Sequence, residues 1–138
     1  MLVRPFQGAD ETAVVELWER CGLTRPWNDP HQDIAQALAS PLSAVLVGES
    51  DGRIVASVLV GFDGHRAWVY YVSVDPECQQ GGLGRILMAA AEDWAREQGA
   101  RKLELMVRRS NAAAGAFYQA LGYVDQDTIA YGKWLDRD

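Results

Sequence analysis

Two short segments of the chain carry residue types whose spacing suits group-transfer chemistry. Residues 111–123 read NAAAGAFYQALGY, and in a helix they place the amide of Asn111 and the phenol of Tyr118 on one face. Residues 79–84 read QQGGLG, a glycine-rich turn that opens onto a long helical pattern. This combination suits an enzyme that binds a pyrophosphate-bearing cofactor at the turn and needs a proton donor near the cofactor's other end.

The glycine-rich turn lies between an expected strand ending at Val74 and an expected helix beginning at Leu83. Unpaired backbone N–H groups and the positive end of the helix dipole converge there, and glycine permits a close backbone approach. The natural ligand is a phosphate or pyrophosphate; the alternative is a tight turn that needs glycine only for its geometry. A nucleoside triphosphate loop is excluded because no Gly-Lys-Ser/Thr ending follows, and the dinucleotide fingerprint would need glycine in place of Leu87.

Hydrophobic periodicity and turn residues predict the elements that position these two segments. Strands are expected at residues 2–6, 44–49, 53–62, 67–74 and 102–107, with one or two closing strands within residues 123–135. Helices are expected between Asp10 and Gly22 and at residues 31–40, 83–98 and 111–121, with Asp10 as the first N-cap and Glu16–Arg20 as an i,i+4 ion pair. The order predicts an α/β (α+β) fold: a mixed, mostly antiparallel sheet of six to seven strands with four helices on its faces.

Length and composition indicate one ordinary globular domain over residues 1–138. The net charge of −6 argues against sequence-independent binding to nucleic acid, which needs a basic surface. No apolar run approaches the ~20 residues that cross a membrane. Cys21 and Cys78 follow no secretory signal and are expected to be reduced thiols. We therefore expect a cytoplasmic protein without a nucleic-acid or membrane partner.

The segment Val72–Arg85 resembles the cofactor loop of the bacterial Gcn5-related N-acetyltransferases, the GNAT family. That loop reads Arg or Gln, two residues, Gly, one residue, then Gly or Ala, and the matching positions here are Gln79, Gly82 and Gly84. The family's Asn-x-x-Ala-x-x-Phe-Tyr segment is matched by Asn111, Ala114, Phe117 and Tyr118. The expected order of elements also fits the GNAT fold, in which the fourth and fifth strands splay apart, so the resemblance covers essentially the whole chain.

The resemblance implies an acetyl-CoA-dependent N-acetyltransferase that moves an acetyl group to a primary amine by direct transfer in a ternary complex. Residues 105–122 are similar to the ribosomal-protein N-terminal acetyltransferases. The Arg25–Pro30 loop and the Asp63–Arg66 turn look more like a small, poorly assigned bacterial branch of the family. The acceptor could therefore be a protein N-terminus or a small-molecule amine.

The cofactor site implied by the resemblance combines the fourth strand with the glycine-rich turn. The main-chain groups of Val72 and Val74 would hold the pantetheine arm as if it were an extra strand, in the gap between the splayed strands. The amide of Val72, or one beside it, would polarise the thioester carbonyl. The residues expected to hold the pyrophosphate through their amides are Gln79, Gln80, Gly81, Gly82, Leu83, Gly84 and Arg85.

The resemblance also assigns catalytic roles, and each has a structural alternative. Tyr118 would protonate the departing thiolate, because a phenol with a pKa near 10 suits a thiolate of similar pKa; otherwise it is a core tyrosine. Asn111 would hydrogen-bond the cofactor, or it caps the helix that follows. Related enzymes use a strand glutamate as base where this chain has Met106. Glu104, on the same strand face, is thus the candidate base, directly or through water, unless it is simply exposed at a sheet edge.

In this fold the loop between the first two helices and the start of the fourth strand border the acceptor pocket. The residues that would surround the amine are Arg25, Trp27, Asn28, Asp29, Asp63, His65 and Tyr70. Carboxylates and aromatic faces suit a cation. In the structural alternative, Trp27 plugs the core and Asp29 caps the second helix. His65 is a further candidate base, and because the two histidines have no metal-ligand spacing, no metal is expected.

Two functions of other classes remain open from the sequence. A non-catalytic acyl-CoA-binding module would keep the glycine-rich turn and regulate a partner, and the lack of an obvious base leaves this reading available. A structural subunit of an assembly would show a large exposed apolar patch. Family members often form dimers, so a homodimer is a further possibility.

Overall fold

The computed structural model describes residues 1–79 and 81–137, and Gln80 lies outside the described residues. The chain divides into two compact units, Met1–Leu105 and Met106–Asp138, which are described separately below. The first unit contains β1 (Leu2–Pro5), α1 (Glu11–Arg20), α2 (Pro30–Ala39), β2 (Ser43–Ser50), β3 (Arg53–Phe62), β4 (Ala67–Val74), α3 (Leu83–Glu97) and β5 (Leu103–Glu104), with short 3₁₀ helices η1 (Gly8–Asp10) and η2 (Pro76–Cys78). The second unit contains α4 (Ala112–Ala120).

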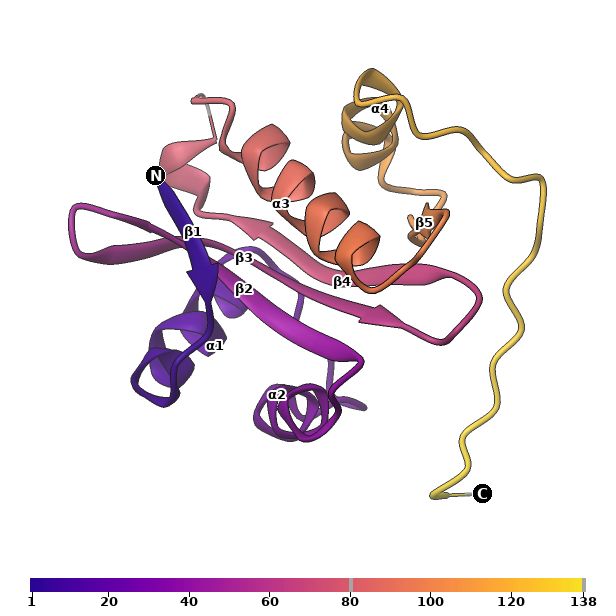
Figure 1. The fold of residues 1–138 in the computed structure, drawn as a ribbon, viewed down its shortest axis with the longest axis horizontal. Coiled ribbons are helices and arrows are strands. Elements are labelled where there is room, and N and C mark those ends of the chain that lie inside the picture. The colour runs from indigo at the N-terminus through magenta and orange to yellow at the C-terminus, as the bar shows by residue number, and fades with distance from the viewer. Residues whose placement is uncertain (80, 138) are drawn as a thin grey trace. The chain divides into compact units, whose positions relative to one another are not determined.

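The sheet of the first unit has the strand order β1-β2-β3-β4-β5. The first three pairs are antiparallel, and β5 is parallel to β4 because α3 provides the crossover between them. Figure 1 shows α1 and α2 on one face of the sheet and α3 on the other. The mixed sheet with helices on both faces confirms the predicted fold class.

Local sequence rules account for the best-predicted elements. β3 and β4 have the predicted bounds, and α3 ends within one residue of its predicted end. The β2–β3 hairpin turns through Asp51 and Gly52, whose φ angles of 52° and 75° fit a two-residue type I′ turn. A core of buried side chains joins α1 and α2 to β2, and its members are Val14, Val15, Trp18, Ile34, Ala37, Val45 and Val47.

The prediction of six to seven strands was wrong in number, because the sheet has five strands among the described residues. The fifth strand is limited to Leu103–Glu104, although residues 102–107 have a strand pattern. No strand forms within the described part of residues 123–135. Asp125 accepts a hydrogen bond from the backbone N–H of Asp127, whose φ is 53°, so a turn interrupts the closing segment. Strand-like side-chain patterns do not by themselves supply a pairing partner.

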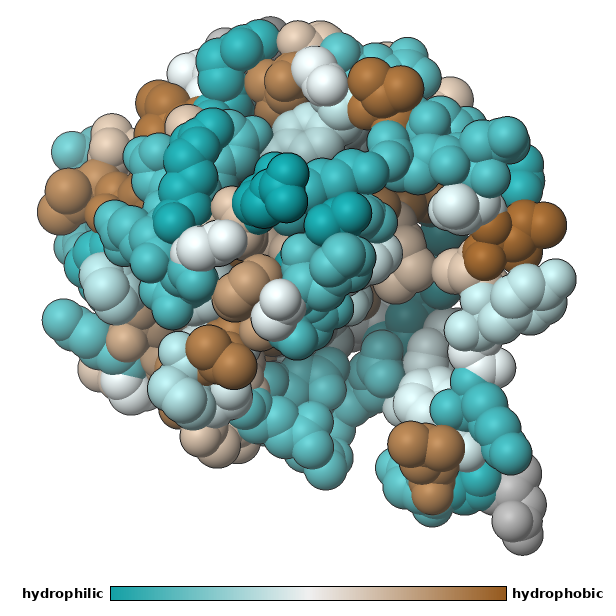
Figure 2. All heavy atoms as spheres, turned by 45° about the vertical axis from the view of Figure 1, so that its right-hand side comes forward, coloured by the Kyte–Doolittle hydropathy of each residue, from teal (hydrophilic) through white to brown (hydrophobic). Residues whose placement is uncertain are grey.

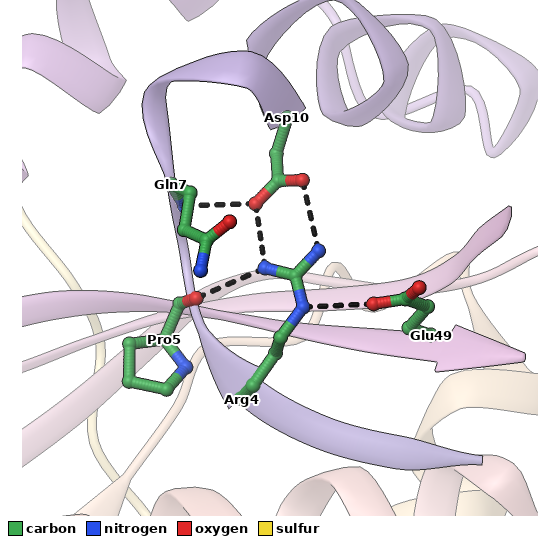
Figure 3. Close-up of polar contacts among 5 residues, drawn as sticks. All are labelled: Arg4, Pro5, Gln7, Asp10 and Glu49. Carbon is green, nitrogen blue, oxygen red and sulfur yellow. Dashed lines mark hydrogen bonds and ion pairs between the residues drawn. The ribbon is translucent and has the colours of Figure 1, made fainter. Parts of the chain in front are cut away.

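The predicted side-chain roles in the first helix were also wrong. The Asp10 carboxylate does not cap α1; it accepts hydrogen bonds from the Arg4 guanidinium at 2.8 and 3.0 Å and from the Gln7 N–H at 2.8 Å (Figure 3). Arg4 also donates to Glu49 at 2.9 Å, so the cluster joins β1 to η1 and β2. Arg20 pairs with Asp75 rather than with the expected Glu16.

The cysteines, the helix lengths and the surface were also compared with the sequence. Cys21 and Cys78 are both free, as expected of reduced thiols. Among the described residues, no helix combines the length and apolar character that crossing a membrane requires. On the face drawn in Figure 2, hydrophobic side chains are dispersed as separate groups among hydrophilic ones.

Candidate active site

The edge of β4 that faces β5 is paired over only two residues. Ala67 pairs with Leu103 and Trp68 with Glu104, and the ladder then ends. Along Val69–Val74, no described residue of β5 continues this pairing. The edge therefore offers main-chain groups to an extended ligand, as the predicted splay of the fourth and fifth strands requires.

A β-bulge interrupts β4 within this edge. On β3, Ser57 and Leu59 are two residues apart, whereas their partners on β4, Ser73 and Tyr70, are three residues apart. The bulged residues are Tyr71 and Val72, and Tyr71 has a φ of 54°. The Ser73 hydroxyl lies 3.1 Å from the Ser57 carbonyl oxygen and 3.2 Å from that of Tyr71, so it can donate to either one. A bulge of this kind leaves backbone groups out of the ladder, and here it does so at the residue predicted to polarise the thioester.

The turn from β4 to the glycine-rich loop is held by the buried carboxylate of Asp75. Its Oδ1 accepts a hydrogen bond from the Glu77 N–H at 3.0 Å, and its Oδ2 lies 2.9 Å from Arg20 Nη2 and 3.8 Å from Arg53 Nη2. The backbone N–H from Glu77 and the neighbouring Arg20 guanidinium lower the pKa of Asp75. The carboxylate therefore stays charged and fixes the start of the loop.

The loop itself ends at the N-terminus of α3. Gly82 is the N-cap and has a φ of 72°, a conformation that favours glycine. Gly82 has no side chain to cap the helix, and the first turn of α3 carries no acidic residue. The amides at Leu83, Gly84 and Arg85 thus lie in the part of a helix that binds anions.

Val74, at the end of β4, already has donors on its carbonyl oxygen. The side-chain amide of Gln79 donates to it at 3.1 Å, and the thiol of Cys21 at 3.3 Å. Gln79 therefore ties the loop to the strand through its side chain, a contact that its predicted role did not include. A pantetheine amide at this carbonyl would share or replace these donors.

Glu104 lies at the end of β5 beside two cations. Its Oε1 is 3.4 Å from Arg66 Nε and 3.8 Å from Lys102 Nζ. The side chain is about one-fifth exposed, so the carboxylate is not simply a solvated group at the sheet edge. Its role as a base stays a prediction.

Three of the predicted acceptor residues make local structural contacts. Arg25 donates to the carbonyl oxygens of Gly22 and Thr24 at 2.7 and 2.9 Å. Asp29 caps α2 by accepting from the N–H groups of residues 31 and 32, which confirms the structural alternative for this residue. Asp63 accepts from the N–H groups of residues 65 and 66 at 2.8 Å, and these hydrogen bonds lower its pKa. These side chains shape the loops that border the expected acceptor pocket.

The remaining acceptor candidates are exposed. Trp27 is 45% exposed and Tyr70 is 44% exposed, so Trp27 does not plug the core as the structural alternative supposed. Asn28 and His65 are exposed as well. Partial burial of its ring, together with the nearby Asp63, raises the pKa of Tyr70, which keeps its phenol neutral.

In the second unit, α4 presents the other two predicted residues. Asn111 is the N-cap, and its Oδ1 accepts from the Ala114 N–H at 3.1 Å, so the capping alternative is confirmed and Nδ2 is left for another partner. Tyr118 lies edge-on to Phe117 and Tyr123, with ring centroids 5.0 and 5.9 Å apart. Burial raises the pKa of Tyr118 to about 12, so the phenol is protonated at neutral pH. The approach of these groups to the cofactor loop stays a prediction.

Comparison with known proteins shows the family of this chain. Residues 11–123 match the model of the acetyltransferase (GNAT) family. The chain belongs to the GNAT family. It is 43% identical over 135 residues to an acetyltransferase of Yersinia enterocolitica (98% of this chain, 96% of the relative) and 42% identical over 138 residues to one of Pectobacterium atrosepticum (100% and 98%). An aminoglycoside N-acetyltransferase, solved in complex with the bisubstrate analogue CoA-S-monomethyl-acetylneamine, shares the fold with a TM-score of 0.84 at 16% identity (96% and 97% coverage).

In this GNAT acetyltransferase, sequence reasoning missed several residues that contact the candidate site. Tyr71 packs flat against Trp18 of α1, with ring centroids 3.8 Å apart, and donates a hydrogen bond to Asp33 of α2 at 2.7 Å. Arg20 reaches Asp75 at the start of the cofactor loop. No motif marks these residues, because each is defined by contacts between elements far apart in the sequence.

Proposed function

We propose that this GNAT enzyme transfers the acetyl group of acetyl-CoA to a primary amine, a protein N-terminus or a small molecule, by direct transfer in a ternary complex. The proposal rests on one observation: the edge of β4 that faces β5 and the N-terminus of α3 follow one another along the chain and could bind one extended ligand. Along Val69–Val74, β4 has no β5 strand partner among the described residues, and this edge leads through the Asp75 turn to the N-terminus of α3, where Gly82 provides no side-chain cap. An extended pantetheine arm suits a strand edge, and a pyrophosphate suits a helix N-terminus.

The described loop residues fit the phosphate end of this cofactor. Backbone amides of Gly81–Arg85 supply donors, and the positive φ of Gly82 turns the chain so that α3 can begin there. A relative of the same fold was solved with a CoA-containing bisubstrate analogue, which supports CoA as the donor and an amine as the acceptor. The predicted role of Gln80 lies outside the described residues.

Acetyl-CoA supplies the acetyl group as an activated thioester. The amide of Val72, at the bulge, would donate a hydrogen bond to the carbonyl oxygen and stabilise the negative charge that grows there during attack by the amine. As the carbon–sulfur bond breaks, the Tyr118 hydroxyl would give its proton to the sulfur, and its raised pKa keeps that proton in place beforehand. Asn111 Nδ2 would hold the cofactor close to Tyr118.

Removal of the proton from the amine limits the choice of acceptor. At neutral pH an α-amine with a pKa of about 8 loses its proton at a cost of about 1 kcal/mol, whereas a lysine side chain costs more than about 4 kcal/mol. Glu104, held by Arg66 and Lys102, would accept that proton directly or through water. We therefore expect amines of low pKa to be the better substrates, with the exposed rings of Trp27 and Tyr70 as candidate contacts for the ammonium form.

The first experiment is a thermal-shift measurement with acetyl-CoA, CoA, NAD and ATP at equal concentration. Ligand at ~100 times its dissociation constant adds about 2.7 kcal/mol of stability, which is several degrees for a domain of this size. A shift with the CoA species alone supports the donor site, and release of CoA thiol with a panel of α-amines and lysine analogues then tests the acceptor. No shift with either CoA species would refute the proposal. Binding without turnover on any amine would favour the non-catalytic module.

A further inference from the structure

Tyr71 has a backbone conformation that a bulky side chain rarely adopts. Its φ of 54° lies in the left-handed region, which is sterically unfavourable for residues other than glycine. Strained conformations of this kind persist only where the surrounding contacts determine them. Since Tyr71 is part of the β4 bulge, the contacts that hold its side chain also fix the path of β4 at this point.

Two helices hold the Tyr71 side chain. Its ring stacks on Trp18 of α1 with an interplanar angle of 5° and a centroid separation of 3.8 Å, and Trp18 is completely buried in the core. Its hydroxyl donates a 2.7 Å hydrogen bond to Asp33 Oδ2 on α2. The stack fixes the plane of the ring, and the hydrogen bond fixes its far end, so the side chain has little freedom to rotate.

The backbone on the C-terminal side of the bulge is held by Ser73. Ser73 Oγ lies within hydrogen-bond distance of the carbonyl oxygens of Tyr71 and Ser57. Tyr71 and Val72 together oppose a single residue of β3, so the strand cannot slide without breaking the pairs on both sides of the bulge. Val72 is thus the residue between two fixed points, Tyr71 and Ser73.

We propose that Tyr71 and Asp33 are positioning residues for acetyl transfer, which hold the β4 bulge so that the Val72 amide points at the thioester carbonyl. The inference rests on the proposed function and adds to it the residues that fix the direction of the hydrogen-bond donor. It also connects α2, next to the expected acceptor pocket, with the donor site through one hydrogen bond. Electrostatic stabilisation by a backbone amide depends steeply on its alignment, so a small rotation of the bulge would reduce the rate.

The test combines kinetics with a spectroscopic signal from the bound cofactor. Tyr71→Phe removes the hydroxyl and keeps the stacked ring, and Asp33→Asn keeps an acceptor oxygen but removes its charge. We expect Tyr71→Phe to lower kcat roughly tenfold, a fraction of the loss caused by deleting an oxyanion donor, with KM for acetyl-CoA nearly unchanged. Asp33→Asn should fall between this variant and the wild type. In infrared difference spectra of both variants, the carbonyl band of bound [1-¹³C]acetyl-CoA should move from the frequency seen with the wild type towards that of the free thioester.

Matched controls separate positioning from a general loss of stability. Tyr131→Phe removes a hydroxyl from a tyrosine that is 92% exposed, and Asp93→Asn removes an exposed charge from α3, so both should keep the wild-type kcat and carbonyl band. If Tyr71→Phe does not fold, Asp33→Asn provides the measurement, because it leaves the stacked rings intact. A destabilised but folded variant with the wild-type band and kcat would overturn the inference.

The two proposals fail in different ways. Wild-type protein that binds no acetyl-CoA would refute the proposed function, and this inference with it. Wild-type protein that binds acetyl-CoA and turns over, while both variants match it in kcat and carbonyl band, would refute the positioning role alone.

Discussion

Arg20 Nη2 lies 2.9 Å from Asp75 Oδ2, and this ion pair joins the last turn of α1 to the turn between β4 and the cofactor loop. The Asp75 side chain is 4% exposed, so its charge depends on Arg20, Arg53 and the N–H of Glu77 for compensation. Because η2 begins at the next residue, the ion pair connects α1 to the start of the glycine-rich loop. A contact from α1 thereby holds the turn that leads to the expected phosphate site.

Asp75→Asn tests this connection. The variant loses the charge that pairs with Arg20, and hydrogen bonds to charged groups contribute about 1.5–3 kcal/mol, so the melting temperature should fall by several degrees. KM for acetyl-CoA should rise more than kcat falls, since the proposed role of the loop is to bind the cofactor away from the reacting carbon. Thermal melts and steady-state kinetics measure both effects, and Asp93→Asn serves as the control. An unchanged melting temperature and KM would show that the ion pair is dispensable.

Acid should destabilise the first unit through Asp10 and Asp75. The hydrogen bond from Arg4 lowers the pKa of Asp10, and that from the Glu77 N–H lowers the pKa of Asp75. The unfolded chain, with carboxyl pKa values of about 3.9, therefore binds protons before the folded protein does. The stabilisation by these two carboxylates is complete above the unfolded-state pKa of about 3.9. It is lost as the pH falls through their lower pKa values in the folded protein.

Denaturant unfolding between pH 7 and pH 2 measures this loss directly. The free energy of unfolding should be flat near neutrality with respect to these two groups and should fall below about pH 4. Asp75→Asn should show a shallower decline, because one of the two carboxyl groups is gone. An equally steep decline in the variant would assign the acid sensitivity to other groups.

The accuracy of the sequence-based predictions depended on how local each interaction is. The bounds of β3 and β4 and the beginning of α3 follow from periodicity and turn chemistry within a few residues, and these were correct. The closing strands of residues 123–135 were wrong, because alternation gives a tendency to form a strand and not a partner. The pairing of Arg20 with residue 75 rather than residue 16 was missed for the same reason: it is set by tertiary packing.

The same difference between local and tertiary interactions separates the predicted from the missed features of the candidate site. The loop around Gly82 could be found from glycine spacing, and the capping roles of Asp29 and Asn111 from helix-start rules. The bulge at Tyr71 could not be predicted from the sequence. A bulge is defined by the register of a strand against its partner, and the side-chain pattern of β4 alone does not show that register. Its contacts to Trp18 and Asp33 depend on how α1 and α2 pack against the sheet.

Gly82→Ala tests whether the turn before α3 needs glycine. The φ of 72° is unfavourable for a residue with a Cβ, at a cost of about 1–2 kcal/mol, although no atom of a described residue lies within 4 Å of that position. The strain should reorient the first amides of α3, so affinity for CoA should fall by more than the loss of stability alone explains. Calorimetric titration with CoA measures the affinity. Gly8→Ala, also without neighbours within 4 Å and without a positive φ, is the control and should bind CoA as the wild type does.

Tyr118→Phe tests the proton donor. Without the hydroxyl, the departing thiolate must take its proton from water, so kcat should fall ~10²-fold, while CoA binding should persist because the ring remains. Burial raises the pKa of Tyr118 to about 12, so the wild-type phenol is protonated throughout the usual assay range and is lost as a donor only as the pH rises towards that value. The wild-type kcat should therefore show no decline from this group between pH 7 and pH 10. Steady-state kinetics over that range test this role of Tyr118, and Tyr131→Phe is the control. A Tyr118→Phe enzyme with full kcat and retained CoA binding would assign protonation of the thiolate to another group.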